Sequence, residues 1–103
     1  MLGNVPKFIR MGSLMKVKYF AYLRDYTGSK EIEAEHCESL RELLIMLCDR
    51  HGPRFKGKIF KNDGLSDEII IMVNGRNIVH LQGLDTLLSP EDEISIFPVV
   101  AGG

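Results

Sequence analysis

The residues of this chain whose types and spacing could support chemistry occupy its last seven positions. They are an aromatic residue, a proline, two valines, an alanine and two glycines: Phe97, Pro98, Val99, Val100, Ala101, Gly102 and Gly103. Two glycines form a thin and pliable segment because neither has a Cβ atom. At the end of a chain, such a segment can enter a narrow slot in another protein. We therefore expect the α-carboxylate of Gly103 to be the reactive group.

A carboxylate is a poor electrophile until it is activated, for instance as an acyl-adenylate made from ATP. The activated acyl group of Gly103 could then accept sulfur as a thiocarboxylate, or be transferred to an amine as an amide. A frayed terminus without function is the simpler explanation of a Gly-Gly pair taken alone. The rest of the sequence must therefore decide between these interpretations.

The bulk composition predicts one globular domain. The chain has 103 residues, of which 45% are hydrophobic and 26% charged, with 13 basic and 14 acidic residues. This length allows one modest core, and the net charge of −1 gives no support for nucleic-acid binding. No apolar run approaches the roughly 20 residues of a membrane span. Residues 1–14 lack a signal-peptide pattern, so we expect a flexible extension before a cytoplasmic domain at residues 15–103.

The cysteines and histidines do not predict a metal site or a disulfide. Cys37 and Cys48 lack a metal-binding or redox spacing, and a cytoplasmic protein rarely keeps a disulfide. His36, His51 and His80 are scattered, without the spacing of a ligand pair. His51 falls near the end of a predicted helix, where the helix dipole favours it. We expect no metal and no cofactor bound by the chain itself.

Two strands joined by a short turn open the predicted domain. Residues 15–23 alternate lysines with apolar residues and then become apolar throughout, which is typical of a strand. Residues 31–35 alternate strictly between charged and small or apolar residues, as in an edge strand. Turn-forming residues, Asp25, Thr27 and Gly28, lie between them. The short connection predicts an antiparallel hairpin.

The strongest local signal predicts a helix that begins after Ser39. Ser39 and Glu42 have the spacing of a capping box, in which each side chain satisfies a free backbone N–H group. One apolar stripe at helical spacing follows: Leu40, Leu43, Leu44 and Leu47. Gly52 and Pro53 predict the end of the helix at about His51. Packing of this stripe against a sheet is the favoured interpretation over a partner-binding face.

The second half of the chain predicts further strands. Residues 54–65 mix basic and aromatic residues, and we interpret them as a solvated loop with apolar anchors. Residues 68–73 predict a strand, and Asn74-Gly75 predicts a type I′ hairpin turn with a short returning strand at residues 76–78. Residues 80–90 are irregular, and residues 93–97 predict the last strand. Together the elements predict an α+β fold, with a mixed sheet of four to five strands covered by one main helix.

This order of elements, ending in Gly-Gly, resembles the β-grasp fold of ubiquitin-like proteins, and within it the MoaD/ThiS family of sulfur carriers. The resemblance covers nearly all of residues 15–103, and is strongest to the MoaD branch, the small subunit of molybdopterin synthase. Five segments in the same order carry it: residues 20–25 (FAYLRD), 39–44 (SLRELL), 73–75 (VNG), 88–94 (LSPEDEI) and 97–103 (FPVVAGG). The family pattern often has a second proline where this chain has Val99. That difference restores a backbone N–H group and leaves an extended apolar stem.

The resemblance implies a two-step use of Gly103 by partner proteins. An E1-like adenylating enzyme would activate its carboxylate with ATP and Mg²⁺, and a sulfur donor protein would convert it to a thiocarboxylate. In the MoaD role, the large subunit of molybdopterin synthase would receive the tail, with Phe97, Pro98, Val99, Val100, Ala101 and Gly102 as the docking stem. The chain would then be a non-catalytic subunit that supplies the reactive terminus.

Two other interpretations of the same tail remain open. A ubiquitin-like protein modifier, or a sulfur carrier for tRNA thiolation, would share every chemical feature of Gly103. A β-grasp interaction module with an inert Gly-Gly is the third interpretation. The sequence also leaves open the choice of molybdenum or tungsten and the oligomeric state.

Overall fold

The structure, a computed structural model, describes residues 14–99. The predicted extension, residues 1–14, therefore lies outside the described residues except for Leu14, which is half-buried. Likewise, Val100 to Gly103 lie outside them. The first described strand begins at Met15.

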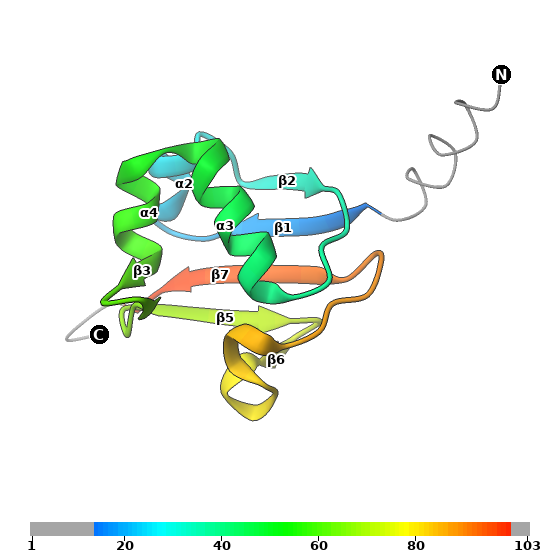
Figure 1. Cartoon of the computed structure of the whole chain (residues 1–103). Helices are drawn as coiled ribbons and strands as arrows, with labels where there is room; N and C mark the ends of the chain where they lie inside the picture. The colour runs from blue at the N-terminus through cyan, green and yellow to red at the C-terminus, as the bar shows by residue number, and fades with distance from the viewer. Residues whose placement is uncertain (1–13, 100–103) are drawn as a thin grey trace, which may run out of the picture.

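A five-stranded mixed sheet forms the body of the molecule (Figure 1). Its strand order is β2-β1-β7-β5-β6, and a separate pair is formed by β3 and β4. The strands are β1 (Met15–Tyr19), β2 (Glu31–Ala34), β3 (Phe60–Lys61), β4 (Gly64–Leu65), β5 (Ile69–Val73), β6 (Arg76–Asn77) and β7 (Glu93–Pro98). The helices are α2 (Leu23–Thr27), α3 (Leu40–His51) and α4 (Pro53–Ile59), with short 3-10 turns η2 (Ile78–His80) and η3 (Gly83–Asp85).

The last strand lies in the centre of the sheet. β7 runs parallel to β1, with Val17 opposite Ile94, and antiparallel to β5, with Ile71 opposite Ile96. β1 pairs antiparallel with β2, as the predicted hairpin requires. A mixed sheet with the main helix on one face confirms the predicted α+β class and the β-grasp fold.

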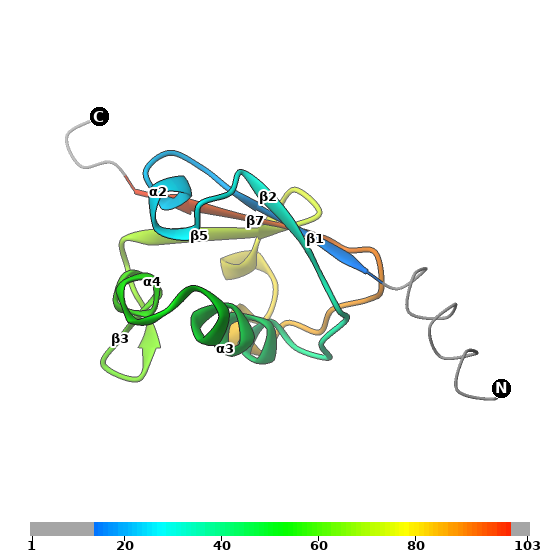
Figure 2. The same cartoon turned by 90° about the horizontal axis from the view of Figure 1, so that it is seen from above.

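Helices α3 and α4 cover one face of the sheet and leave the other face open (Figure 2). The leucine stripe of α3 is fully buried against the sheet, so the prediction of a core-facing stripe is confirmed. Strand residues alternate between this core and the open face, as the pleat of a strand requires. The largest fully buried side chains are Tyr19, Phe55, Met15, Leu23, Leu40, Leu43, Leu44, Leu47, Ile59, Ile71, Ile94 and Ile96.

The predicted caps and turns are confirmed in detail. The Ser39 hydroxyl accepts a hydrogen bond of 3.2 Å from the Glu42 N–H group, and Glu42 Oε1 accepts one of 3.1 Å from the Glu38 N–H group. Asn74 and Gly75 have positive φ angles of 51° and 83°, as a type I′ turn requires. The Asn74 side chain also donates to Asp92 and accepts from the Glu93 N–H group, which joins this hairpin to the start of β7.

The interpretation of residues 54–65 as a solvated loop is wrong. These residues form most of α4 and then the β3–β4 pair. Pro53 occupies the first turn of α4, where its missing N–H group is not needed. Phe55 and Ile59, four residues apart, are fully buried and attach α4 to the core.

The first strand is also shorter than predicted. β1 ends at Tyr19, and residues 23–27, predicted in part as a turn, form helix α2. Leu23 is fully buried and fixes α2 on the core, while Gly28 ends the helix with a φ of 74°. An apolar run in residues 19–23 therefore crosses from strand to helix instead of continuing as a strand.

Candidate functional site

The predicted docking stem begins inside the sheet. Phe97 and Pro98 are the last residues of β7, opposite Ile70 and Ile69 of β5, and Val99 follows the strand. Pro98 is buried, Phe97 is half-buried, and Val99 is 42% exposed. The remaining predicted site residues, Val100, Ala101, Gly102 and Gly103, lie outside the described part of the chain.

The start of the stem is fixed by a backbone hydrogen bond. The Val99 N–H group donates to the Glu68 carbonyl oxygen at 2.7 Å. This bond needs a backbone N–H group at position 99, which the valine has and a proline would lack. The difference from the family pattern noted at this position therefore extends the pairing between the tail and the start of β5 by one residue.

An aromatic pair marks the open face of the sheet where β7 ends. The rings of Phe20 and Phe97 are stacked, with centroids 4.3 Å apart and an angle of 9° between their planes. Ile70, the partner of Phe97 in the β5–β7 register, is half-buried on the same face. These three side chains form a small apolar platform, here called the stem platform: Phe20, Ile70 and Phe97.

Arg24 places a cation beside the stem platform. Its Nε–H group donates to the Tyr19 carbonyl oxygen at 2.9 Å, and its guanidinium carbon lies 5.7 Å from the centre of the Phe20 ring. The side chain is nevertheless exposed, so its charge faces solvent. A cation held over an aromatic face is well suited to contact an anionic group of a partner.

Sequence reasoning assigned Phe97 to the site but gave no role to Phe20, Ile70 or Arg24. The continuous apolar run of β5 could have identified Ile70, because apolar residues on both faces of a strand imply that both faces make contacts. Phe20 and Arg24 could be assigned to the site only from the parallel pairing of β1 with β7, which brings residues far apart in sequence to one end of the sheet.

Charged pairs occupy the open face further from the tail. Lys18 Nζ lies 3.3 Å from Glu93 Oε2, and Lys16 Nζ lies 3.7 Å from Glu31 Oε2. All four side chains are at least one-third exposed, so each pair contributes little stability. The open face is thus apolar beside the tail and ion-paired at its other end.

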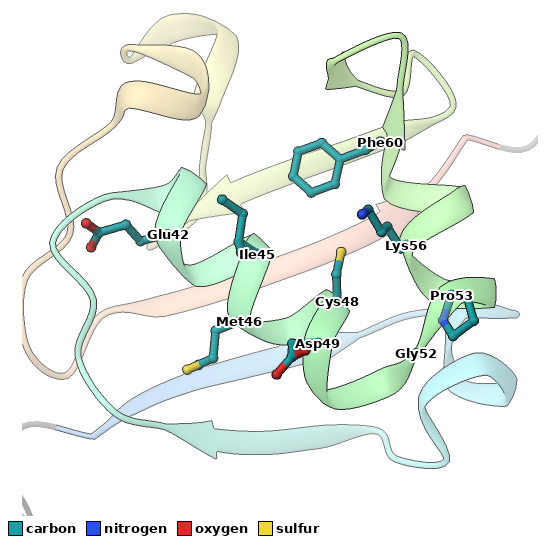
Figure 3. Close-up of a pocket in the computed structure, with 9 residues that line it drawn as sticks. All are labelled: Glu42, Ile45, Met46, Cys48, Asp49, Gly52, Pro53, Lys56 and Phe60. Atoms are coloured by element: carbon teal, nitrogen blue, oxygen red, sulfur yellow. The ribbon is translucent and has the colours of Figure 1, made fainter.

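A groove of about 660 Å³ lies on the opposite side of the molecule, along α3 and α4 (Figure 3). It is lined by Glu42, Ile45, Met46, Cys48, Asp49, Gly52, Pro53, Lys56 and Phe60. Burial raises the pKa of the Cys48 thiol, and the nearby Lys56 only partly opposes this. A raised pKa disfavours the thiolate, which is the nucleophilic form, so this groove lacks an activated thiol.

Other candidate groups do not assemble into a reactive cluster. Within residues 14–99, no group of three or more His, Cys, Asp and Glu side chains could hold a metal ion. Burial also raises the pKa of the Cys37 thiol, assisted by Glu42 and Glu35. In this same part of the chain, no helix is long and apolar enough to cross a membrane.

The groups described above lie together around the end of β7. The central strand leads out of the sheet beside an apolar platform and an exposed arginine. The Val99–Glu68 bond holds Val99 beside the residue that precedes β5. Such an arrangement can hold a partner against the platform while the following residues extend into that partner.

Comparison with known proteins gives a consistent family. The model of the ThiS family matches residues 17–103. A candidate sulfur carrier of Archaeoglobus fulgidus is 44% identical over 77 residues, which cover 74% of this chain and 85% of that protein.

Solved structures extend the comparison to two named functions. The solution structure of small archaeal modifier protein 1 from Methanosarcina acetivorans is 40% identical, with a TM-score of 0.78, covering 88% of this chain and 97% of that one. A candidate molybdopterin converting factor subunit 1 from Pyrococcus furiosus is 34% identical, with a TM-score of 0.68, covering 84% of this chain and 98% of that one.

Proposed function

The chain belongs to the ThiS family of ubiquitin-like sulfur carriers, and we propose that it carries sulfur as a thiocarboxylate on Gly103. The observation that carries the proposal is the position of β7. This central strand ends at Pro98, and only five residues, 99–103, separate it from the terminal carboxylate. Fully extended, five residues reach at most about 18 Å.

The proposed chemistry begins with activation of the terminus. The Gly103 carboxylate attacks the α-phosphorus of ATP in an E1-like adenylating enzyme, which forms an acyl-adenylate and releases pyrophosphate. Hydrosulfide delivered by a sulfur donor protein then attacks the acyl carbon, and AMP leaves with the electron pair of the broken C–O bond. The product is a thiocarboxylate, whose sulfur is a better nucleophile than a carboxylate oxygen. ATP and Mg²⁺ belong to the activating partner.

This chain's own residues supply position and access. Glycine at positions 102 and 103 lets the tail pass a constriction that would exclude any Cβ atom. The stem platform and Arg24 offer the partner an apolar contact and a cation at the root of the tail. The partner contributes the acid and base groups and the substrate pocket, so the chain is a carrier and a non-catalytic subunit. We place these reactions in the cytoplasm, where ATP is available.

For the sulfur acceptor, we propose the pterin precursor of the molybdenum cofactor. In that role the chain is the small subunit of molybdopterin synthase, and its tail enters the large subunit. The likeness to the candidate molybdopterin converting factor subunit from Pyrococcus furiosus supports this assignment.

A second function, protein modification, is favoured by a different likeness. The modifier from Methanosarcina acetivorans is more similar to this chain, at 40% identity against 34%. In a modifier, the activated Gly103 acyl group is transferred to a lysine amine, and an isopeptide bond replaces the acyl-adenylate. Both functions use the same tail and differ only in the acceptor.

The acceptor is tested by supplying the chain with its thiocarboxylate already formed. We expect the thiocarboxylated chain, mixed with the large subunit of molybdopterin synthase and the pterin precursor, to transfer sulfur and return to the carboxylate form. A chain lacking Gly103 is the matched control and should transfer none. Lysine conjugates of the wild-type chain in cells, together with no transfer to the pterin by an active large subunit, would replace the first function by the second.

A further inference from the structure

The charges of this nearly neutral chain are unevenly distributed. Residues 50–62 contain five basic residues and no acidic residue, whereas residues 31–42 contain five glutamates and one arginine. The basic segment covers the end of α3, all of α4 and all of β3. Net charge alone therefore hides a local surplus of positive charge on α4.

Two cations of α4 lie over the aromatic side chains of α2 and its N-cap. The Arg54 guanidinium carbon is 5.2 Å from the centre of the Tyr26 ring. Lys58 Nζ is 5.5 Å from the Tyr22 ring centre and 5.8 Å from that of Tyr26. Tyr22 follows Phe20 by two residues, so these cations stand at the same end of the molecule as the stem platform, as the adjacent positions of α2 and α4 show (Figure 1).

A second chain of contacts leads from α4 to the tail. Lys61 Nζ, just after α4, lies 3.5 Å from Glu68 Oε2. The carbonyl oxygen of the same Glu68 accepts the hydrogen bond from the Val99 N–H group. Glu68 thus connects Lys61 to Val99, where the tail begins. We call Arg54, Lys58 and Lys61 the basic face.

Most of the positive charge of the basic face is not neutralised internally. Among residues 14–99, Arg54 and Lys58 make no ion pair, whereas Lys61 is paired with Glu68. Asp25 on α2 is exposed and is the acidic side chain that α2 contributes at this end. Arg54 is exposed and Lys58 half-buried, so both charges can meet a partner.

We propose that the basic face docks on an acidic surface of the E1-like adenylating enzyme, at the rim of the slot that takes the tail. The inference rests on the proposed function, because it assumes that the tail is adenylated. A tail that reaches at most about 18 Å cannot enter an active site unless the end of the sheet comes close to the enzyme. The cations around that end then lie against the enzyme surface, and acidic groups there fit them best.

The details of the basic face favour a protein partner over RNA. Single-stranded RNA is held by open aromatic faces on which its bases stack. Here Tyr22 and Tyr26 already hold cations close to their rings. Asp25 and Glu68 interrupt the positive charge, which disfavours a uniformly anionic phosphate backbone.

The test compares charge reversals at the two ends of the sheet. The double variant Arg54→Glu/Lys58→Glu reverses the basic face. Arg76→Glu is the matched control, since Arg76 is exposed on β6 at the end of β5 opposite the tail. Binding of each full-length chain to the immobilised E1-like enzyme is measured without ATP, in low salt and in 0.5 M salt.

We expect the double variant to bind about tenfold more weakly in low salt, with most of that difference lost in high salt, and Arg76→Glu to bind within about twofold of wild type. If the double reversal prevents folding, Arg54→Gln/Lys58→Gln replaces it, with an expected loss of about threefold. Equal binding by the double variant and the control, or no binding of the wild-type chain, overturns the proposal.

Two further arms separate this proposal from its premise and from RNA binding. With ATP added, the mass of each chain shows whether Gly103 is adenylated. Adenylation that is equally fast in all variants leaves the proposed function intact and removes the docking role. Binding of the wild-type chain without adenylation keeps the docking role and contradicts the proposed function. Binding of total tRNA that is lost in the double variant, without loss of enzyme binding, would reassign the basic face to RNA.

Discussion

At the scale of single residues, one partly buried contact joins three elements of the fold. The Tyr19 hydroxyl and His51 Nε2 are 2.7 Å apart, and Phe55 packs edge-on against both rings, at 5.8 Å and 5.0 Å between centroids. Tyr19 belongs to β1, His51 ends α3 and Phe55 belongs to α4. Burial raises the pKa of the Tyr19 phenol, so the hydroxyl stays protonated and can donate to a neutral imidazole.

This contact predicts a pH dependence of stability. Burial, and then the nearby Arg50, lower the pKa of His51 below its ordinary value of about 6.5. Below that pH the unfolded chain therefore binds more protons than the folded chain, and stability falls as the pH drops from 7.5 towards the folded pKa. The variant His51→Gln keeps an acceptor for Tyr19 but does not titrate. We expect its melting temperature to fall less between pH 7.5 and pH 5 than that of the wild-type chain.

His80 provides the control for that measurement, because it is an exposed histidine outside the cluster. The variant His80→Gln should keep the pH slope of wild type in the same thermal-unfolding series. Identical slopes for wild type and His51→Gln would show that the Tyr19–His51 contact does not couple folding to protonation.

Residue-level prediction from the sequence succeeded where the physical cause is local. The Ser39 cap and the Asn74-Gly75 turn depend on neighbours within four residues, and the structure has both. The prediction for His51 was incomplete, because it included only a favourable interaction with the dipole at the end of the helix. Its partner Tyr19 is 32 residues away in the chain, and no local pattern indicates that pairing.

At the scale of elements, α3 is the helix on which the core depends, and its start is well defined. The Ser39 hydroxyl satisfies one N–H group of the first turn, and the Leu40 N–H group donates to the Thr86 carbonyl oxygen at 2.9 Å. A second backbone bond, from Leu88 N–H to Glu38, joins the same segments. The beginning of α3 is thus attached to the strand-like segment before β7.

We expect Ser39→Ala to lower the free energy of unfolding by about 1 kcal/mol, because the Glu42 N–H group loses its acceptor. Ser39→Asp keeps an acceptor at this position and should remain close to wild type. Urea denaturation of the three proteins measures the difference, with an unchanged dependence on urea concentration indicating an unchanged fold. Equal loss in both variants would mean that the hydroxyl does not act as a cap.

Prediction at the level of elements failed at α4 for an identifiable reason. Its basic residues and Gly57 have the composition of a loop, and only two positions, Phe55 and Ile59, face the core. Two apolar residues at helical spacing are too few to distinguish a seven-residue helix from a loop with anchors. The packing of these two side chains against the sheet stabilises α4 despite its weak local preference.

At the scale of the whole molecule, the sheet order determines what the tail can do. The parallel pairing of β1 with β7 puts the last strand at the centre of the sheet, so β7 ends between the β1–β2 hairpin and β5. Local patterns predicted the strands but not this pairing, which depends on the connection of distant segments. The likeness to ubiquitin-like proteins predicted the β-grasp fold and its mixed sheet, which the structure confirms, but it was not used to predict which strands pair.

The same topology gathers the groups proposed to act around the tail at one end of the sheet. Phe20 comes from the end of β1, Ile70 from the start of β5, and the cations Arg54 and Lys58 from α4. The strands were predicted from the sequence and α4 was not, and the convergence of these groups at one end of the sheet required the fold. Gly102 and Gly103, which carry the proposed chemistry, were identified from the sequence, and they lie outside the described residues.

The most direct test of the central claim is the intact mass of the chain after incubation with an E1-like enzyme, ATP and a sulfur source. A chain lacking Gly103 serves as the control. We predict a mass gain of about 16 Da, the replacement of one oxygen by sulfur, in the wild-type chain only. An unchanged mass, with an enzyme shown to activate another carrier, would contradict the assignment of Gly103 as a sulfur-carrying terminus.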